Sequence, residues 1–456
     1  MTTGSQVGST APGVDLRAAF RAEFPSGRRS LWVSGRGDDR ADGLVASRPL
    51  RTVQAAIDRS RAGDRIVVGA GTYGHTEFFD RHGTPDAWIT VEAAAGTTPV
   101  INVSRSRASW DPTRGTNGLD VQLSSHVAVF GLEIRGDQAS ADPDPSGIAV
   151  FRGSRSVGIW ACHVHDFPGG GVNCFHSAAA AVGATVLPAG GWDAVDVSFC
   201  TIHATSRRSS YNTSGISFYG AQDLVATTAS RPYGYRAVGN YVYDVVCTVP
   251  YRPGGFDFVT DGNGISVDSL AVANSLAPGL APYLKRGLVE GNVVTACGGR
   301  GVHVYNSRNV DVVGNTLVGN LRTASPAITG STEVAVSLDR PLASNGVVVA
   351  ANVLAPLSSA RAFDRVAQTV TANTAVSGTD AVPPGNQSLR SLGLGAFVVR
   401  PTTAGLALGP ELGSLALVVQ TLVARRPGTT GWAALGRGTR ATGASVAVGA
   451  VRDLPR

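Results

Sequence analysis

The 456-residue chain is predicted to fold as an all-β, single-stranded, right-handed parallel β-helix, because two short patterns alternate along it. The first pattern is a glycine followed by alternating aliphatic and variable residues, which indicates a strand with one buried face. It recurs at irregular spacing, which is typical of stacked coils with loops of variable length. Its six members are GLDVQ at Gly118, GIAVF at Gly147, GVNCF at Gly171, GISFY at Gly215, GISVD at Gly264 and GVHVY at Gly301.

The second pattern lies between members of the first and reads aliphatic-x-aliphatic-x-x-[Asn or Cys]-x-aliphatic. Asn292 and Asn315 are 23 residues apart (315 − 292), enough for a coil of three short strands and three turns. Stacked coils would align the asparagines into a ladder of hydrogen-bonded amides. An antiparallel sandwich would instead need hairpin turn pairs at even spacing, which are scarce here. The sixth position of the pattern is Leu132, Cys162, Cys200, Asn240, Asn292, Asn315, Asn352 and Asn373.

Composition narrows the class of protein. The 57 glycines and only 16% charged residues suit tight turns around an apolar interior. No apolar run is long enough to span a membrane, and no signal peptide is visible in MTTGSQVGSTAPGV. The net charge of +6 comes from arginine, since Lys285 is the only lysine. These basic residues are scattered and no nucleic-acid-binding module is visible, so no nucleic-acid partner is expected.

The five cysteines show no zinc-binding spacing. Cys162 and Cys200 share the ladder column on neighbouring coils. That placement would permit a disulfide, but two buried thiols that fill the column are the preferred interpretation.

The chain divides into four segments. Residues 1–28 are polar and unpatterned, and are expected to be a flexible lead-in. Residues 29–82 form an N-terminal cap of strand, loop, short helix, turn and strand, with Thr52 as the helix cap. Residues 83–380 form the β-helix, and residues 381–456 are expected to supply closing strands, a cap or a tail.

The cap segment, LWVSGRGDDRADGLVASRPLRTVQAAIDRSRAGDRIVVGAGTY from Leu31 to Tyr73, resembles that of secreted pectate lyase-like β-helix proteins. GTPDAWITVEAAAGTTPVI, from Gly83, resembles the first coil in that superfamily, and the resemblance extends to Val376. The superfamily includes polysaccharide lyases, glycoside hydrolases, esterases, epimerases and phage tailspikes, so function has to come from the site. The resemblance implies a polysaccharide partner and an extracellular or cell-surface location.

Loop lengths predict where a cleft lies. Gly171 to Cys200 spans 29 residues (200 − 171), against 14 from Gly301 to Asn315 (315 − 301). The other middle coils carry similar insertions on both sides of the glycine-led strands. Long loops on a rigid scaffold usually carry function, so they should form walls around a groove floored by these strands.

Alternation also predicts which side chains face that groove. Two columns of outward side chains are expected to run along the stacked strands. In the second of them, exposed aromatic rings one coil apart would form a platform for sugar rings, unless the inserted loops cover them. We therefore expect Asn173, Phe175, Tyr219, Ser266 and Tyr305 to bind substrate. The first outward column is Asp120, Ala149, Asn173, Ser217, Ser266 and His303, and the second is Gln122, Phe151, Phe175, Tyr219, Asp268 and Tyr305.

An acid, an imidazole and two cations are expected near one another. Asp268 and His303 lie on successive coils, Arg300 precedes the same strand as His303, and Lys285 closes the loop after Asp268. Such a set suits β-elimination on a uronate, which needs a base, a cation that neutralises the carboxylate and an acid. Lyases of the superfamily use lysine or arginine as base, so the resemblance implies Lys285 or Arg300, completed by His303 and Asp268.

The resemblance also suggests calcium as a cofactor. Asp257 and Asp261 precede Asp268 in GGFDFVTDGNGISVD and offer oxygen ligands, but no calcium-loop signature is present. The preferred interpretation of DGNG is a turn before a strand.

Three functions stay open at this point. The leading one is a lyase acting on an acidic, uronate-containing polysaccharide. The first alternative is a glycoside hydrolase, although clustered aspartates like those of polygalacturonases are missing and a carboxylate pair would have to come from different coils. The second is a non-catalytic glycan-binding or tail-fibre module.

Histidines in CHVHD at Cys162 raise a separate question. His165 and His203 fall at the same register on neighbouring coils, with Asp166 beside the first. Two stacked imidazoles could bind a metal, but no third ligand is evident in the sequence. A stack of polar residues on a solvated outer turn is the preferred interpretation.

Overall fold

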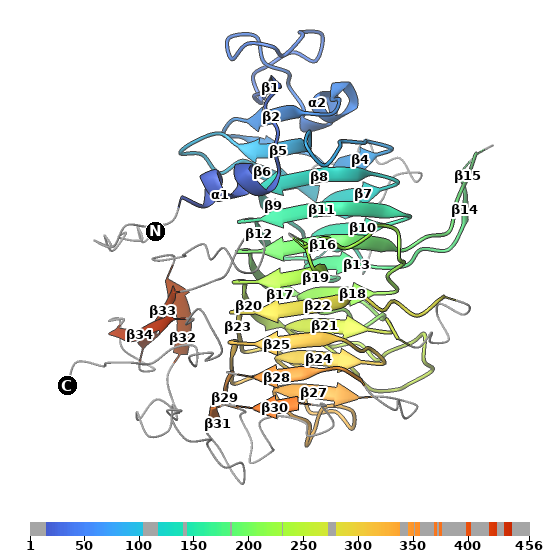
Figure 1. Ribbon diagram of the computed structural model, residues 1–456, viewed down its shortest axis with the longest axis vertical. Helices are drawn as coiled ribbons and strands as arrows, with labels where there is room; N and C mark the ends of the chain where they lie inside the picture. The colour runs from blue at the N-terminus through green and yellow to red at the C-terminus, as the bar shows by residue number, and fades with distance from the viewer. Residues whose placement is uncertain are drawn as a thin grey trace.

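Three long parallel sheets wrap around one apolar interior (Figure 1). The structure is a computed structural model, and it describes residues 15–103, 117–139, 144–182, 185–229, 231–271, 280–337, 345–350 and 352–355, and the strands at 369–371, 374–375, 398–402, 419–425 and 433–439. Each coil between Asp64 and Ser337 contributes one strand to each of the three sheets, which are named A, B and C in the order in which the chain enters them, and strands of successive coils pair in parallel. The predicted parallel β-helix is therefore confirmed by the strand pairing of the chain itself.

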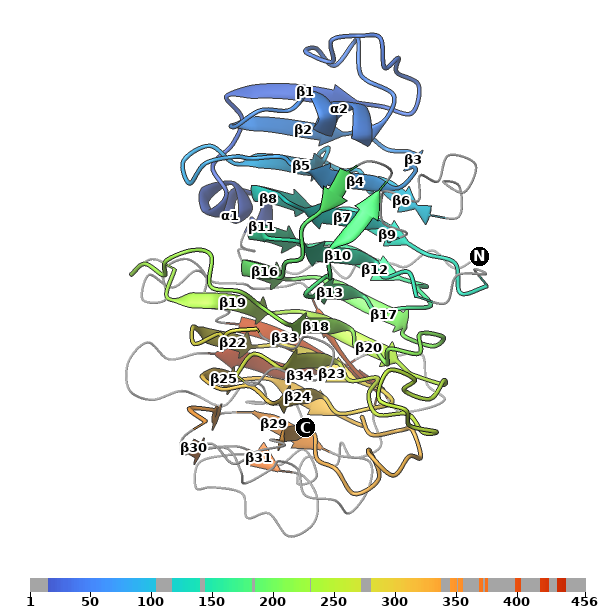
Figure 2. The same cartoon turned by 90° about the vertical axis from the view of Figure 1, so that its right-hand side faces the viewer.

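The strands of each sheet follow one another along the long axis (Figure 2). Sheet A is β1 (Arg29–Val33), β2 (Asp64–Val68), β5 (Ile89–Ala93), β8 (Ser125–Phe130), β11 (Ser154–Trp160), β16 (Trp192–Ser198), β19 (Tyr233–Val238), β22 (Arg286–Glu290), β25 (Val310–Val313), β28 (Val348–Ala350) and β30 (Thr369–Thr371). Sheet B is β3 (Thr72–Tyr73), β6 (Val100–Asn102), β9 (Glu133–Arg135), β12 (His163–His165), β17 (Thr201–Thr205), β20 (Tyr241–Val245), β23 (Val293–Thr295), β26 (Thr316–Val318), β29 (Val353–Ala355) and β31 (Thr374–Ala375). Sheet C is β4 (Thr76–Phe79), β7 (Leu119–Gln122), β10 (Ile148–Phe151), β13 (Val172–Cys174), β18 (Ile216–Tyr219), β21 (Ile265–Asp268), β24 (Val302–Tyr305) and β27 (Val334–Ser337).

Two small antiparallel sheets accompany the coils. One is a hairpin, β14 (Ala180–Val182) and β15 (Thr185–Leu187), in the loop between β13 and β16. The other is formed near the C-terminus by β32 (Val398–Thr402), β33 (Val419–Arg425) and β34 (Ala433–Thr439).

The glycine-led strands all belong to sheet C and stack in the predicted register. Ile148 pairs with Leu119 and Val172, and Ile265 pairs with Ile216 and Val302. Their inward aliphatic side chains are fully buried in the central core. Because every strand keeps this register, the alternate residues are held in straight columns on the outer face of the sheet.

The predicted asparagine ladder runs along the turn between sheets A and B. The side-chain amide of Asn240 donates to Oδ1 of Asn292 at 2.9 Å, Asn292 to Asn315 at 2.8 Å, and Asn315 to Asn352 at 2.9 Å. Each of these oxygens also accepts the backbone N–H of the preceding ladder residue. Asn373 lies outside the described residues. The ladder thus satisfies buried amides while it ties successive coils together.

Cys162 and Cys200 continue the ladder toward the N-terminus as free, buried thiols, as preferred from the sequence. The backbone N–H of Cys200 donates to Oδ1 of Asn240 at 2.9 Å, which joins the thiols to the amides. The residue before each ladder position has a left-handed backbone, which produces a two-residue turn from sheet A to sheet B. These residues are Gly131, Ala161, Phe199, Gly239, Gly291 and Gly314.

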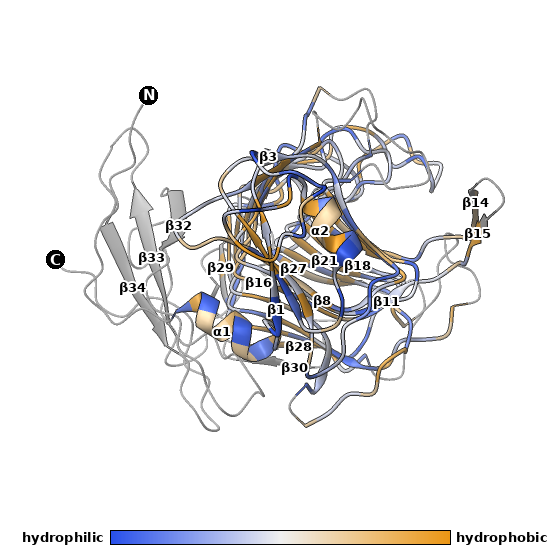
Figure 3. Ribbon diagram, turned by 90° about the horizontal axis from the view of Figure 1, so that it is seen from above, coloured by the Kyte–Doolittle hydropathy of each residue, from blue (hydrophilic) through white to orange (hydrophobic). Residues whose placement is uncertain are grey.

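Helix α2 (Val53–Arg59) covers the N-terminal end of the solenoid (Figure 3). The Thr52 side chain accepts the backbone N–H of Ala55 at 3.1 Å, so the predicted helix cap is confirmed. Ala56 and Ile57 are fully buried against the first coil. No helix in the described part of the chain is long and apolar enough to cross a membrane.

Helix α1 (Leu16–Glu23) lies within the segment expected to be a flexible lead-in, and the structure differs there. Phe20 and Phe24 lie on one face of the segment and pack against Trp88 and Trp160 on the outer face of sheet A. Glu23 also forms an ion pair with Arg236 at 3.0 Å. Residues 15–24 are therefore docked on the solenoid, because their apolar face packs against the tryptophans and the Glu23 carboxylate pairs with Arg236.

Candidate active site

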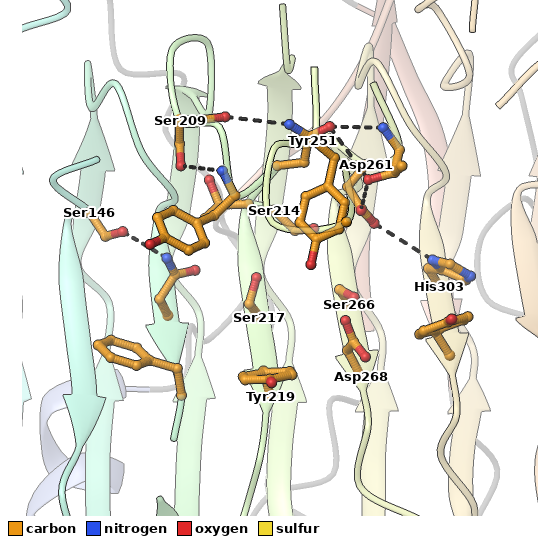
Figure 4. A pocket seen from close by; sticks show the side chains of 18 of the residues that line it. Ser146, Ser209, Ser214, Ser217, Tyr219, Tyr251, Asp261, Ser266, Asp268 and His303 are labelled. Atoms are coloured by element: carbon orange, nitrogen blue, oxygen red, sulfur yellow. Dashed lines mark hydrogen bonds and ion pairs between the residues drawn. The ribbon is translucent and has the colours of Figure 1, made fainter. Parts of the chain in front are cut away.

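A cleft of about 1380 Å³ opens over the outer face of sheet C. Its floor is formed by the middle strands of that sheet, and its walls by the loops that enter and leave them (Figure 4). The described lining includes eight residues of the two predicted outward columns, namely Asn173, Phe175, Ser217, Tyr219, Ser266, Asp268, His303 and Tyr305. The structure thus brings together all five predicted substrate-binding residues and three of the four predicted catalytic ones, Asp268, Arg300 and His303.

The N-terminal parts of both columns are covered. Asp120 and Ala149 are fully buried, and Phe151 retains only 7% exposure. Phe151 stacks on Phe175 with ring centroids 4.9 Å apart, so Phe175 marks the end of the open floor. The alternative prediction, that the aromatic rings of the second column are covered, therefore holds only for this N-terminal end of the column.

Asp261 and His303 form a pair at the other end of the cleft. His303 Nδ1 lies 3.8 Å from Asp261 Oδ1, and His303 Nε2 lies 3.3 Å from Ser337 Oγ. Asp261 also accepts hydrogen bonds from Thr260 and Asn263. Burial acts to raise the pKa of the Asp261 carboxyl. The hydrogen bond and charge of His303, together with the charge of Arg300 and the hydrogen bond from Thr260, outweigh it, so the pKa is lowered. Asp261 is thus held ionised beside an imidazole.

Asp268 stands on the floor one coil below Tyr305, with which it pairs in register. Its Oδ1 accepts a hydrogen bond from Ser269 Oγ at 2.6 Å. Tyr251, from the loop before β21, projects over the floor near Ser266 (Figure 4). Burial raises the pKa of Tyr251 to about 12, with a further contribution from the charges of Asp268 and Asp261, so its phenol keeps its proton.

Arg300 lines the cleft as predicted, but its guanidinium is bound to the wall. Nε donates to Ser331 Oγ at 2.9 Å, Nη1 to the Thr260 carbonyl at 3.0 Å and Nη2 to the Ala327 carbonyl at 2.5 Å. Burial lowers the pKa of Arg300 from its usual value, and the charge of Asp261 opposes this. These contacts make Arg300 a clamp that fixes two wall loops.

Lys285 does not line the cleft, so its predicted place beside Asp268 is wrong. Its ammonium forms ion pairs with Asp193 and Asp223 and donates to the Val225 carbonyl. The physical reason is that Lys285 directly precedes β22 of sheet A, where the buried Asp193 carboxylate needs a cation. A base at Lys285 would be out of reach of the cleft.

The predicted calcium ligands are separated as well. Asp257 is exposed on the loop and is absent from the cleft lining, whereas Asp261 is engaged with His303. Within the described residues, the one group of three His, Cys, Asp or Glu side chains close enough to share a metal is Glu133, His163 and His165, on another face.

Several lining residues lie in loops and carry no periodic signal in the sequence. Asp144 accepts a hydrogen bond from Ser209 Oγ at 2.7 Å across two wall loops. Tyr211 and Phe256 stand at the rim with 56% and 42% of their surface exposed. The length of the insertions was the only sequence signal that pointed to these walls.

Comparisons with known proteins give no close relative. No family model matches the chain, and no curated protein matches it. Among solved structures, the chain is similar to a rhamnogalacturonan lyase, at 13% identity and a TM-score of 0.43 over 85% of this chain and 95% of that one. It is also similar to a pectate lyase, at 14% identity and a TM-score of 0.42 over 87% and 92%. A lacto-N-biosidase from Eubacterium ramulus matches at 13% identity and a TM-score of 0.37 over 76% and 67%. No residue role is transferred at such values.

Proposed function

We propose that this protein is a carbohydrate-active enzyme that hydrolyses a glycosidic bond in the cleft over sheet C. The observation that carries the proposal is the presence of two carboxylates, Asp261 and Asp268, at one end of an aromatic-floored groove. A pair of carboxylates is the usual machinery of glycoside hydrolysis, in which one acts as acid and the other as base or nucleophile.

The floor is suited to a sugar chain. Phe175, Tyr219 and Tyr305 present rings on which the C–H faces of sugars can pack, and Asn173 and Ser217 add hydrogen-bonding groups between them. Because these residues come from successive coils, the glycan would run across the strands, along the long axis of the solenoid.

The ionisation of the site suggests the roles of the two acids. Asp261, whose pKa is lowered chiefly by His303 against the opposing effect of burial, is the base or nucleophile. Asp268 would supply the proton to the leaving oxygen, for which its carboxyl has to be protonated once the glycan fills the cleft and excludes water. His303 positions Asp261 and keeps it charged.

The charge of the lining favours a neutral or weakly charged glycan. Asp144, Asp261 and Asp268 line the cleft, whereas Arg300 is the only arginine or lysine among the described lining residues. A polyuronate would bring its carboxylates toward these acids, and the one guanidinium already makes three hydrogen bonds to the walls.

β-Elimination on a uronate is the second candidate, and the position of Arg300 favours it. A guanidinium has five N–H groups, of which the wall contacts described above use three, so it can still donate toward a substrate carboxylate. His303 would then abstract the proton at C5 and a tyrosine phenol would protonate the leaving oxygen. A lyase acting on an acidic polysaccharide therefore stays an alternative, in which Lys285 has no catalytic role.

One panel of substrates distinguishes these reactions. Neutral and uronate-containing glycans are incubated with the protein, and the products are followed by reducing ends, by ultraviolet absorbance of unsaturated uronates and by NMR of the anomeric protons. Hydrolysis predicts reducing ends of one anomeric configuration without ultraviolet absorbance; absorbance would establish elimination. Retention of glycans with no product would indicate a binding module. An extracellular or surface location follows from a glycan substrate and stays a prediction.

A further inference from the structure

Four ionisable side chains gather on the outer face of sheet B, away from the cleft lining. Glu133 on β9 pairs in register with His163 on β12, and His165 on β12 pairs with His203 on β17. All four side chains belong to alternate positions that point outward, because the residues between them, Ile134, Val164 and Ile202, are fully buried. Three successive coils therefore contribute to one patch.

The distances within the patch suit a small divalent cation. His165 Nε2 lies 3.4 Å from Glu133 Oε1, and His163 Nε2 lies 2.9 Å from His203 Nε2. Ligands about 2.0–2.1 Å from a tetrahedral zinc ion are themselves roughly 3.3–3.4 Å apart. Ligand atoms of Glu133, His163 and His165 all lie within 4.8 Å of one another. Only small side-chain rotations would bring them onto one ion.

The partners of His165 also point to a cation. Its Nδ1 lies 2.9 Å from Asp166 Oδ2, and its Nε2 lies on the side of the Glu133 carboxylate. A carboxylate that orients a histidine in this way is the usual outer partner of a metal ligand.

Two competing groups face the patch: Arg135 Nη1 lies 3.8 Å from Glu133 Oε1, and Tyr243 stacks under His203 at 4.6 Å. Arg135 is 41% exposed and can turn away, whereas Tyr243 only fixes the plane of His203.

We propose that Glu133, His163 and His165, with His203 as a fourth ligand, bind a zinc ion that joins three successive coils on the outer face of sheet B. Imidazole and carboxylate ligands without thiolate suit zinc and its neighbours among the transition metals, and not calcium. Since the ligands come from coils that are separate in the unfolded chain, the ion would stabilise the folded solenoid. This site is independent of the proposed glycan cleavage.

The test uses full-length protein without a polyhistidine tag, after treatment with a chelator. Zinc is titrated by calorimetry, the unfolding temperature is measured with and without zinc, and cobalt is added as a spectroscopic probe. We expect one zinc ion per chain, a rise in unfolding temperature and the intense visible absorbance of tetrahedral cobalt. No binding, or cobalt that retains its aqueous spectrum, would overturn the proposal without any variant being made.

Variants then identify the ligands. Glu133→Gln and His163→Ala should weaken zinc binding by at least about tenfold, and Asp166→Asn, which removes only the orienting partner, by about 10- to 100-fold. The matched control is His82→Ala, which removes a histidine paired with Asp80 at 2.9 Å on another surface. Equal zinc affinity in Glu133→Gln, His163→Ala and the control would rule out this site. Circular dichroism of the zinc-free variants checks that they remain folded.

Discussion

His303 Nδ1 lies 3.8 Å from Asp261 Oδ1, although the two residues belong to neighbouring coils and are 42 positions apart (303 − 261). The pairing exists because β21 and β24 stack in register, which brings the turn before one strand beside the side chain of the next. It places an ionised carboxylate at the end of a groove whose floor is aromatic. The first two predictions rest on this relationship.

Replacing either carboxylate should nearly abolish glycan cleavage. Asp261→Asn and Asp268→Asn each remove a proton-transfer group, which contributes on the order of 10²- to 10⁴-fold to rate. Asp257→Asn is the matched control, since Asp257 lies in the same loop but is exposed and outside the cleft lining. Initial rates on the substrate found in the panel measure the effect. Full activity in both cleft variants would refute the carboxylate mechanism.

The acid side of the pH–activity profile should depend on His303. Burial acts to raise the pKa of Asp261, and the hydrogen bond and charge of His303 lower it below the ordinary value of 3.8. Wild-type kcat/KM should therefore fall only below about pH 4. In His303→Gln the effect of burial is offset only by the charge of Arg300 and the hydrogen bond from Thr260, so the acid limb should move to higher pH. An unchanged limb in the variant would mean that His303 does not control Asp261.

Loss of a floor ring should weaken binding more than it slows chemistry. Tyr219→Ala removes a stacking surface worth about 0.5–1.5 kcal/mol, which corresponds to a rise in KM of roughly 2- to 13-fold with kcat little changed. Tyr241→Ala, on the outer face of sheet B, is the control and should leave KM unaltered. If kcat fell and KM did not, Tyr219 would belong to the chemistry and not to the binding platform.

Breaking the asparagine ladder should destabilise the whole solenoid. Asn315 accepts two hydrogen bonds from Asn292 and donates to Asn352 and the Val289 carbonyl, all in the buried interior. Asn315→Ala leaves buried partners unsatisfied, which costs about 1–3 kcal/mol for each such group. Urea unfolding measures the loss, with the exposed Arg322→Ala as control. Ordinary surface substitutions change the free energy of unfolding by up to about 0.5 kcal/mol. If the losses in Asn315→Ala and Arg322→Ala differed by less than this, the ladder would not be stabilising the fold.

Asp120, at the covered end of the first outward column, should make the free energy of unfolding depend on pH. Burial raises the pKa of Asp120 to about 7, while Asn117 partly opposes the shift. A raised folded-state pKa means that stability is greatest at pH below the unfolded value and is lost as pH rises toward 7. Asp120→Asn has no carboxyl to ionise and avoids this loss. Relative to the wild type, the free energy of unfolding of the variant should therefore rise from nearly no difference at pH 4 to a limit of roughly 4 kcal/mol above pH 7. Urea unfolding at pH 4 and pH 8 tests this; an equal effect at both values would contradict it.

Much of the scaffold could be predicted from the sequence, because a strand period of two and the recurring glycine and asparagine positions leave a direct imprint on it. The pairing of Ser266 with His303 and of Asp268 with Tyr305 follows from aligning the glycines alone. The shared register of His165 and His203 was predicted in the same way. Glu133 and His163 also follow from it, since Glu133 follows Leu132 as His163 follows Cys162.

The walls of the cleft could not be predicted, because loops have no period. Lys285 was placed beside Asp268 on the length of one loop, but its position is decided by the buried Asp193 on sheet A, which is remote in sequence. Asp261 was considered only as a calcium ligand, because its partner His303 is reached through the path of a turn. Partners of charged loop residues depend on tertiary contacts that local patterns do not encode.

The connections between the three sheets differ in how much their length varies. From β8 onward, the passage from sheet A to sheet B is held to two residues by its left-handed backbone and by the ladder. The other two passages range from a few residues to long excursions such as the β14–β15 hairpin. Doubling the length of a flexible loop costs only about 0.6 kcal/mol in closure entropy. The wall loops can therefore change in length at a small cost in free energy of unfolding, while the stack of coils beneath keeps its register.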